Sequence, residues 1–124
     1  MMSRELVELA RSGYEAVRRG DFDTVREFLD PDVRWHAGDP TAEFACQNRG
    51  QALRWMRRAR RRGPIGELVE LIDAGDKVVV IMRRIGEDGE PELIANLTTF
   101  RDGKAIEMVH YPNPDDARAA AGLS

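Results

Sequence analysis

The spacing of apolar residues changes once along the chain, and this change constrains the fold more than any other feature of the sequence. Up to Arg62, most apolar side chains recur every three or four residues, as on one face of an α-helix. From Gly66 to Pro112 they alternate every second residue, as in β-strands, with turns at AGD, GEDGE and RDG. Helices followed by a meander of strands indicate an α+β fold rather than alternating β–α units.

The part before the change predicts three helices and one strand. Apolar stripes at helical spacing cover residues 3–19, 22–29 and 50–62. Between the second and third helices, the segment DPD interrupts the chain, and VRWHA (residues 33–37) alternates as a strand. Residues 38–50 are polar and rich in turn formers, which predicts a loop beside the site where a ligand binds.

The part after the change predicts four strands and a short closing helix. The strands lie within residues 66–75, 76–86, 91–103 and 104–112. The helix begins at NPDD, where Asn113 is suited to accept from free backbone N–H groups and proline fits the first helical position. No repeat or long linker divides the sequence, so we expect a single domain over residues 1–124.

Composition excludes several classes of protein. With 42% hydrophobic and 33% charged residues, the chain is typical of soluble globular proteins. Its net charge of −3 gives no overall attraction to nucleic acid or anionic lipid, and no stretch is apolar enough to span a membrane. The single cysteine, Cys46, cannot form an internal disulfide, and no His, Cys or carboxylate spacing predicts a metal site. We expect a cytoplasmic protein with no metal and no cofactor.

The arginine run RRARRR, residues 57–62, invites a nucleic-acid-binding interpretation. However, it lies on the polar side and last turns of a predicted helix, where cations complement the negative end of the helix dipole. No aromatic residue interrupts the run to stack on bases. We therefore expect a solvated helix face and no nucleic-acid partner.

Both faces of the predicted sheet are apolar, which is unusual for an antiparallel sheet with one wet face. In the third strand of the meander, Ile94, Asn96, Thr98 and Phe100 alternate with Leu93, Ala95, Leu97 and Thr99. The helices can cover one of these faces. A second copy of the chain is the economical cover for the other, so we expect a homodimer through the outer sheet face.

The order of these elements, with several short segments, resembles the SnoaL-like branch of the nuclear transport factor 2-like superfamily, related to ketosteroid isomerases and polyketide cyclases. The segments that carry the resemblance are YEAVRRGDFDTVREFLDPDVRWH, RG at 49–50, LIDAGDKVVV, TTFRDGKAIEMVHY and DDARAAAGL. The resemblance implies a cystatin-like α+β roll: a curved antiparallel or mixed sheet forms a cone around the N-terminal helices. It also implies an apolar pocket inside that cone, which family members use to bind small molecules.

The resemblance does not extend to the catalytic groups of ketosteroid isomerase, which are an aspartate base, a tyrosine and a protonated aspartic acid. The position of the base falls at Ala37, or near it at His36 or Asp39, and the acid falls at Thr98. Tyr14 lies on the right helix but one residue from the family position, a rotation of roughly 100°. We therefore expect no standard ketosteroid isomerase activity.

His110, in the predicted strand KAIEMVHYP, is the candidate catalytic base. It shares a strand face with Ile106 and Met108, whereas Ala105, Glu107, Val109 and Tyr111 take the other face. Related cyclases have a carboxylate base late in the sheet, and an imidazole with a pKa of about 6.5 could replace it. Alternatively, His110 is structural and bonds a backbone carbonyl. Its outward-facing counterpart, His36, is expected at the surface or in a dimer contact.

The remaining candidate residues would line the pocket. Tyr14 or Asn96 would donate a hydrogen bond to an oxyanion formed from the substrate. The side chains expected to contact the substrate are Trp35, Trp55, Asn96, Thr98, Phe100 and Met108. Equally, the aromatic residues and the methionine could simply fill the cone, and Thr98 could be the hydrogen-bond partner of Asn96.

Two functions follow from these residues, and the sequence leaves both open. One is a small-molecule-binding domain that performs acid–base chemistry, as an isomerase, dehydratase or cyclase, on a small oxygenated apolar substrate. The other is a non-catalytic ligand-binding or dimerisation module of the same fold, favoured by the absence of a paired carboxylate.

Overall fold

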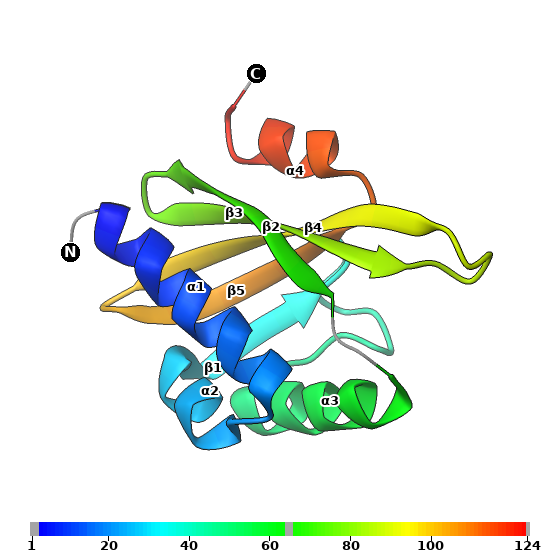
Figure 1. Ribbon diagram of the computed structural model, residues 1–124. Helices are drawn as coiled ribbons and strands as arrows, with labels where there is room; N and C mark the ends of the chain where they lie inside the picture. The colour runs from blue at the N-terminus through cyan, green and yellow to red at the C-terminus, as the bar shows by residue number, and fades with distance from the viewer. Residues whose placement is uncertain (1–2, 64–65, 124) are drawn as a thin grey trace.

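The computed structural model describes residues 3–63 and 66–123, and its elements follow the predicted order (Figure 1). They are α1 (Ser3–Arg19), α2 (Phe22–Phe28), β1 (Leu29–His36), α3 (Arg49–Arg62), β2 (Glu67–Ala74), β3 (Lys77–Ile85), β4 (Pro91–Arg101), β5 (Lys104–Tyr111) and α4 (Pro114–Ala120). The α+β class expected from the change in apolar spacing is confirmed.

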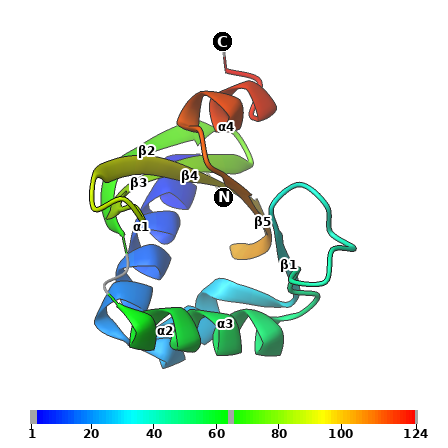
Figure 2. The same cartoon turned by 90° about the vertical axis from the view of Figure 1, so that its right-hand side faces the viewer.

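The five strands form one mixed sheet in the order β1-β5-β4-β3-β2. The meander β2 to β5 is antiparallel, whereas β1 lies parallel to β5 at one edge. The sheet curves around α1, and α2 and α3 lie below it, so that the three helices share its concave side (Figure 2). This arrangement is the cone that the family resemblance implies.

The concave side holds the larger core. Phe28 at the end of α2 contacts Tyr14 of α1 and Phe100 of β4 edge-to-face, at ring-centroid distances of 6.1 and 5.8 Å. Gly13 allows this approach, because a Cβ there would lie 2.6 Å from the Phe28 ring. The rest of this core comes from alternate sheet residues and the three helices, and includes Val33, Met56, Val78, Val80 and Met108.

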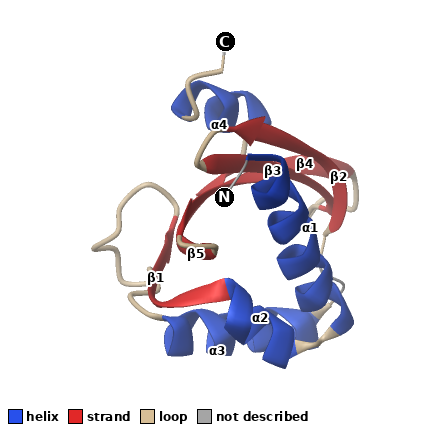
Figure 3. Ribbon diagram, turned by 90° about the vertical axis from the view of Figure 1, so that its left-hand side faces the viewer, coloured by secondary structure: helices blue, strands red, loops and turns tan. Residues whose placement is uncertain are grey.

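The convex side has a smaller core beneath α4 (Figure 3). Asn113 caps this helix by accepting from the Asp115 N–H at 2.9 Å, as its sequence predicted. Ala117 packs on the outer residues of β3 and β4, which are Val79, Ile81, Ala95 and Leu97. The chain therefore covers part of its own outer face, while Ile85 and Leu93 remain exposed there. The homodimer stays a prediction.

Two local expectations were wrong, both because a strand is irregular. DPD does not separate α2 from β1 but lies inside β1, where the pairing with β5 shifts between Leu29 and Arg34. Pro31 has no N–H for a sheet bond, which explains the shift. In β5, the register shift near Ile106 brings Ala105 into the inner core instead of the outer face.

Candidate functional site

Four polar side chains lie on the otherwise apolar inner face of the cone: Tyr14, Asn96, Thr98 and His110. Asn96 and Thr98 alternate along β4 with outward residues, and His110 is the register partner of Asn96 on β5. α1 crosses this part of the sheet and brings Tyr14 to β4 (Figure 1). We call these four residues the inner polar cluster.

Tyr14 and Thr98 form the innermost pair of the cluster. The Tyr14 hydroxyl and Thr98 Oγ1 lie 2.8 Å apart, and either can donate. Burial raises the pKa of Tyr14 to about 12, although its hydrogen bonds with the side chains of Thr98 and Asn96 oppose the rise. Tyr14 is therefore protonated at neutral pH and suited to donate a hydrogen bond, not to act as a base.

Asn96 is the buried amide of the cluster. Its side chain sits between Val80 on β3 and His110 on β5, and the residue is 4% exposed. Within the described part of the chain, Asn96 Oδ1 is fully buried and no protein group donates to it. A buried acceptor without a donor costs about 1–3 kcal/mol, so its position on the inner face requires an explanation.

His110 lies beside Asn96 in the cluster and is half-buried. Burial lowers its pKa, and the nearby positive charge of Arg84 lowers it further. Its imidazole is therefore neutral near pH 7 and able to accept a proton. Among the described residues, no side chain hydrogen-bonds to the His110 ring, so neither of its two predicted roles is fixed by a partner.

The sequence analysis did not identify Arg84 as part of this region. Arg84 follows Val80 and Met82 on the inner side of β3, and its Nε donates to Glu92 Oε1 of β4 at 2.7 Å. The period-2 alternation of VVVIMRRIG could have identified this position, because it assigns Arg84 to the same strand face as the buried residues Val80 and Met82. The pair places one positive and one negative group at the edge of the inner face, near His110.

The predicted apolar residues are arranged in two groups. Phe100 belongs to the aromatic contact with Phe28 and Tyr14, and Met108 is buried opposite Thr98. The Trp35 and Trp55 rings meet edge-to-face, with their centroids 4.7 Å apart. Trp55 on α3 is 46% exposed and lines the smaller of the two pockets described below.

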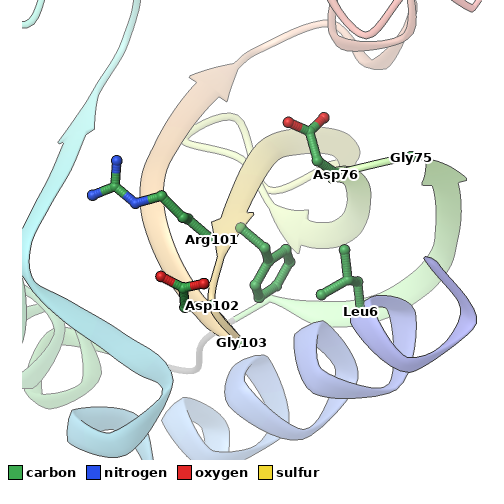
Figure 4. Close-up of a pocket in the computed structure, with 7 residues that line it drawn as sticks. Leu6, Gly75, Asp76, Arg101, Asp102 and Gly103 are labelled. Carbon is green, nitrogen blue, oxygen red and sulfur yellow. The ribbon is translucent and has the colours of Figure 1, made fainter. Parts of the chain in front are cut away.

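Two pockets are described, and neither is lined by Tyr14, Asn96 or His110. The larger, about 610 Å³, is at the turns that end β2 and β4 (Figure 4). Its floor is Leu6 and Phe100, and Asp76, Arg101 and Asp102 surround it. The smaller, about 210 Å³, lies between Trp55 and the loop that carries Cys46.

His36 faces outward, as predicted, but it is not a surface residue. Its side chain is 7% exposed and bonds Glu107 Oε2 through Nε2 at 3.1 Å. The Gly38 N–H donates to Nδ1 at 3.1 Å, so the ring hydrogen is on Nε2 and is donated to the carboxylate. His36 has both ring nitrogens satisfied, unlike His110, which marks it as a structural histidine.

The arginine run, residues 57–62, and Cys46 make contacts within the chain that support the fold. The Arg57 guanidinium lies 5.0 Å from the centre of the Phe22 ring, and Arg60 Nε donates to the Arg18 carbonyl at 3.2 Å. Cys46 is buried and pairs with Trp35 through two backbone hydrogen bonds. Burial raises the pKa of the Cys46 thiol, which disfavours a nucleophilic thiolate.

Residues 3–63 and 66–123 contain neither a cluster of metal ligands nor a helix fit to span a membrane. In these ranges, no three His, Cys, Asp or Glu side chains come together so that they could hold a metal ion. None of the helices described there combines the length and apolar character that a membrane span requires.

The curved mixed sheet, the helices on its concave side and the inner polar cluster define a cystatin-like α+β protein. Comparison with known sequences makes the assignment more specific: the SnoaL-like domain family matches residues 10–108, and the chain belongs to that family. This confirms the resemblance deduced from the sequence. No protein with a curated description matches the chain.

Several solved structures share the fold. A provisionally named polyketide cyclase from Sinorhizobium meliloti is 24% identical, with a TM-score of 0.70, over 89% of this chain and 99% of that one. A protein of unknown function with a cystatin-like fold from Xanthomonas campestris is 21% identical, with a TM-score of 0.72, over 94% and 97%. TerC, co-crystallised with polyporic acid, is 20% identical, with a TM-score of 0.68, over 94% and 97%. At these identities the likeness concerns the fold.

Proposed function

We propose that the chain binds a small, largely apolar, oxygenated molecule at the inner polar cluster and performs acid–base chemistry on it. The observation that carries this proposal is the convergence of Tyr14, Asn96, Thr98 and His110 on the inner face, among apolar side chains. Polar groups that converge in an apolar interior are typical of small-molecule sites. Isomerases, dehydratases and cyclases are the reaction classes that need no more than these groups.

In the proposed reaction, His110 removes a proton from a carbon beside a carbonyl group of the ligand. The electron pair of the C–H bond forms a C=C bond while the π pair of the carbonyl moves onto its oxygen, and Tyr14 donates a hydrogen bond to that oxygen. The imidazolium then returns the proton to another atom of the ligand. The lowered pKa of His110 keeps the base neutral, and the raised pKa of Tyr14 keeps the donor protonated.

The family and its structural relatives support a small-molecule site. The chain belongs to the SnoaL-like family, one relative of the same fold is provisionally named a polyketide cyclase, and another was crystallised with polyporic acid. Because these relatives are below 25% identical, they support the binding of a small molecule by this fold and not the location of the site or the identity of the substrate.

The test uses β-tetralone, an apolar aromatic ketone with acidic hydrogens beside its carbonyl. We expect the wild-type protein to accelerate exchange of these hydrogens in heavy water, followed by proton NMR, and to bind polyporic acid with quenching of tryptophan fluorescence. His110→Gln should lower the exchange rate at least about 100-fold without loss of binding. Tyr111→Phe, on the outer face, is the matched control and should exchange normally.

A second function is favoured by two observations: no carboxylate of the described residues pairs with His110, and Tyr14 is already bonded to Thr98. These contacts suit a module that binds a ligand without transforming it. Binding of β-tetralone with no acceleration of exchange would support this second function. Absence of any binding would contradict both.

A further inference from the structure

Asn96 and Thr98 are the two buried polar residues in the described part of the chain, and the contacts of Asn96 define the chemistry of a ligand. Asn96 is 4% exposed and lies on the inner face, in line with Ile94 and Thr98 and opposite His110. The Tyr14 and Thr98 hydroxyls bond each other at 2.8 Å, and neither is hydrogen-bonded to the Asn96 oxygen. Asn96 Oδ1 therefore remains a buried acceptor without a donor.

Burying such an acceptor is unfavourable, and an apolar residue of the same size would be tolerated better. On the outer face of the same strand, the buried neighbours Ala95 and Leu97 are apolar. The inner position therefore retains an amide where packing alone would favour leucine. A ligand group that donates to Oδ1 would offset the cost.

We propose that Asn96 Oδ1 accepts a hydrogen bond from a hydroxyl group of the ligand, so that the site selects phenols, enols or alcohols over ligands that carry only carbonyl or ether oxygens. This inference rests on the proposed function, since it assumes that a small molecule occupies the inner face. It assigns Asn96 the role of acceptor, whereas the sequence suggested a donor to an oxyanion. Asn96 becomes the specificity-determining residue of the site.

The same geometry determines how His110 lies relative to the bound ligand. Because Asn96 and His110 are directly opposite on antiparallel strands, their side chains start about 5 Å apart on the same face. A hydroxyl bound to Asn96 Oδ1 fixes the orientation of the ligand relative to the imidazole. Asn96 would thus present the ligand to the base without taking part in proton transfer.

The experiment compares phenol, toluene and anisole as ligands, measured by saturation-transfer NMR and calorimetry. Phenol and toluene have nearly the same shape, and transfer from water alone favours toluene. Anisole has an oxygen that accepts but cannot donate. We expect the wild-type protein to bind phenol about tenfold more tightly than toluene or anisole, because only phenol supplies the missing donor.

The matched variant is Asn96→Leu, which keeps the branched shape of the side chain and removes the acceptor. We expect it to lose the preference for phenol and to bind toluene at least as well. It should also raise the thermal midpoint by several °C, because no buried acceptor is left without a donor. Thr99→Val, a polar-to-apolar change on the outer face of β4, should leave the preference unchanged.

The outcomes separate this inference from the proposed function. If all three ligands bind with similar affinity, the site exists but Asn96 does not select for a hydroxyl, and only the inference is overturned. If none of them binds, and β-tetralone does not bind either, the proposed function fails as well. A lower thermal midpoint for Asn96→Leu with an intact phenol preference would also overturn the inference. If that variant does not fold, the ratio of wild-type affinities still decides the question.

Discussion

Alternate residues of β4 face two surfaces that are equally buried but differ in chemistry. The inner residues Asn96 and Thr98 are polar and meet Tyr14 and His110, whereas the outer residues Ala95 and Leu97 are apolar and lie beneath α4. A short helix is sufficient to cover Ala95 and Leu97, because these side chains need only apolar contact. The inner face retains an unpartnered acceptor at a cost in stability. The contrast indicates that packing determines the outer face and ligand binding determines the inner one.

The largest effect should come from removing the aromatic contact that supports the inner face. Phe28→Ala deletes a ring that touches both Tyr14 and Phe100, and we expect a loss of about 3–5 kcal/mol of unfolding free energy. Leu97→Ala, on the outer face, should cost about 2–3 kcal/mol, because a short helix can move toward a shortened side chain. Urea unfolding measures both. A larger loss for Leu97→Ala would contradict the view that the inner face is the principal core.

Alkaline pH should destabilise the inner face through Tyr14. Its pKa is raised to about 12 in the folded state, so the folded protein retains a proton that the unfolded chain releases from about pH 10. Stability is therefore lost as the pH rises from about 10 to 12, by up to ~3 kcal/mol. Unfolding free energies measured across this range should show the loss in wild type and in Tyr111→Phe. Tyr14→Phe should lack it, and an unchanged dependence in that variant would refute the assignment.

The outer face can be perturbed independently through the cap of α4. Asn113→Ala removes the side chain that accepts from the Asp115 N–H, and we expect a loss of about 1 kcal/mol. Asn113→Asp keeps an acceptor at this position and should retain most of the stability. Because α4 lies on the opposite side of the sheet from the inner polar cluster, binding of phenol should not change. A change in affinity would show that the two faces are coupled.

The smallest effect should appear at acidic pH and report on His110. Its pKa is lowered in the folded state, so below about pH 6.5 the unfolded chain binds a proton that the folded protein resists. Stability must fall as the pH decreases through this region. His110→Gln should have a shallower dependence, measured by thermal unfolding between pH 4 and 8. The same dependence in wild type and variant would mean that His110 is solvated rather than half-buried in the cone.

The order of the elements was readable from the sequence, because apolar spacing reports helices and strands directly. The inner row of β4 was also correct, since alternation assigns Asn96, Thr98 and Phe100 to one face once the strand is recognised. Alternation failed at Ala105, because one extra residue in β5 reverses the faces and nothing local marks the position. The alternation argument was applied to β5 but not to Arg84 of β3, so the positive charge beside His110 was missed.

Contacts between residues that are far apart along the chain could not be predicted from the sequence. Whether Trp55 pointed into or away from the cone depended on how α3 lies against β1, and helical periodicity does not specify that angle. The burial of His36 likewise arises from Glu107, which lies 71 residues further along the chain. Such pairs are formed by the curvature and register of the whole sheet.

The sequence by itself determined the class of the fold, the resemblance to the family and the inward-facing row of β4, because these depend on local periodicity and on the order of short segments. Only the tertiary structure decided which of these residues meet. It joined Tyr14 to Thr98, left Asn96 Oδ1 without a donor and placed α4 on the outer face. The physical reason is that hydrogen-bond satisfaction and burial depend on distances across the sheet, which residue spacing along the chain does not encode.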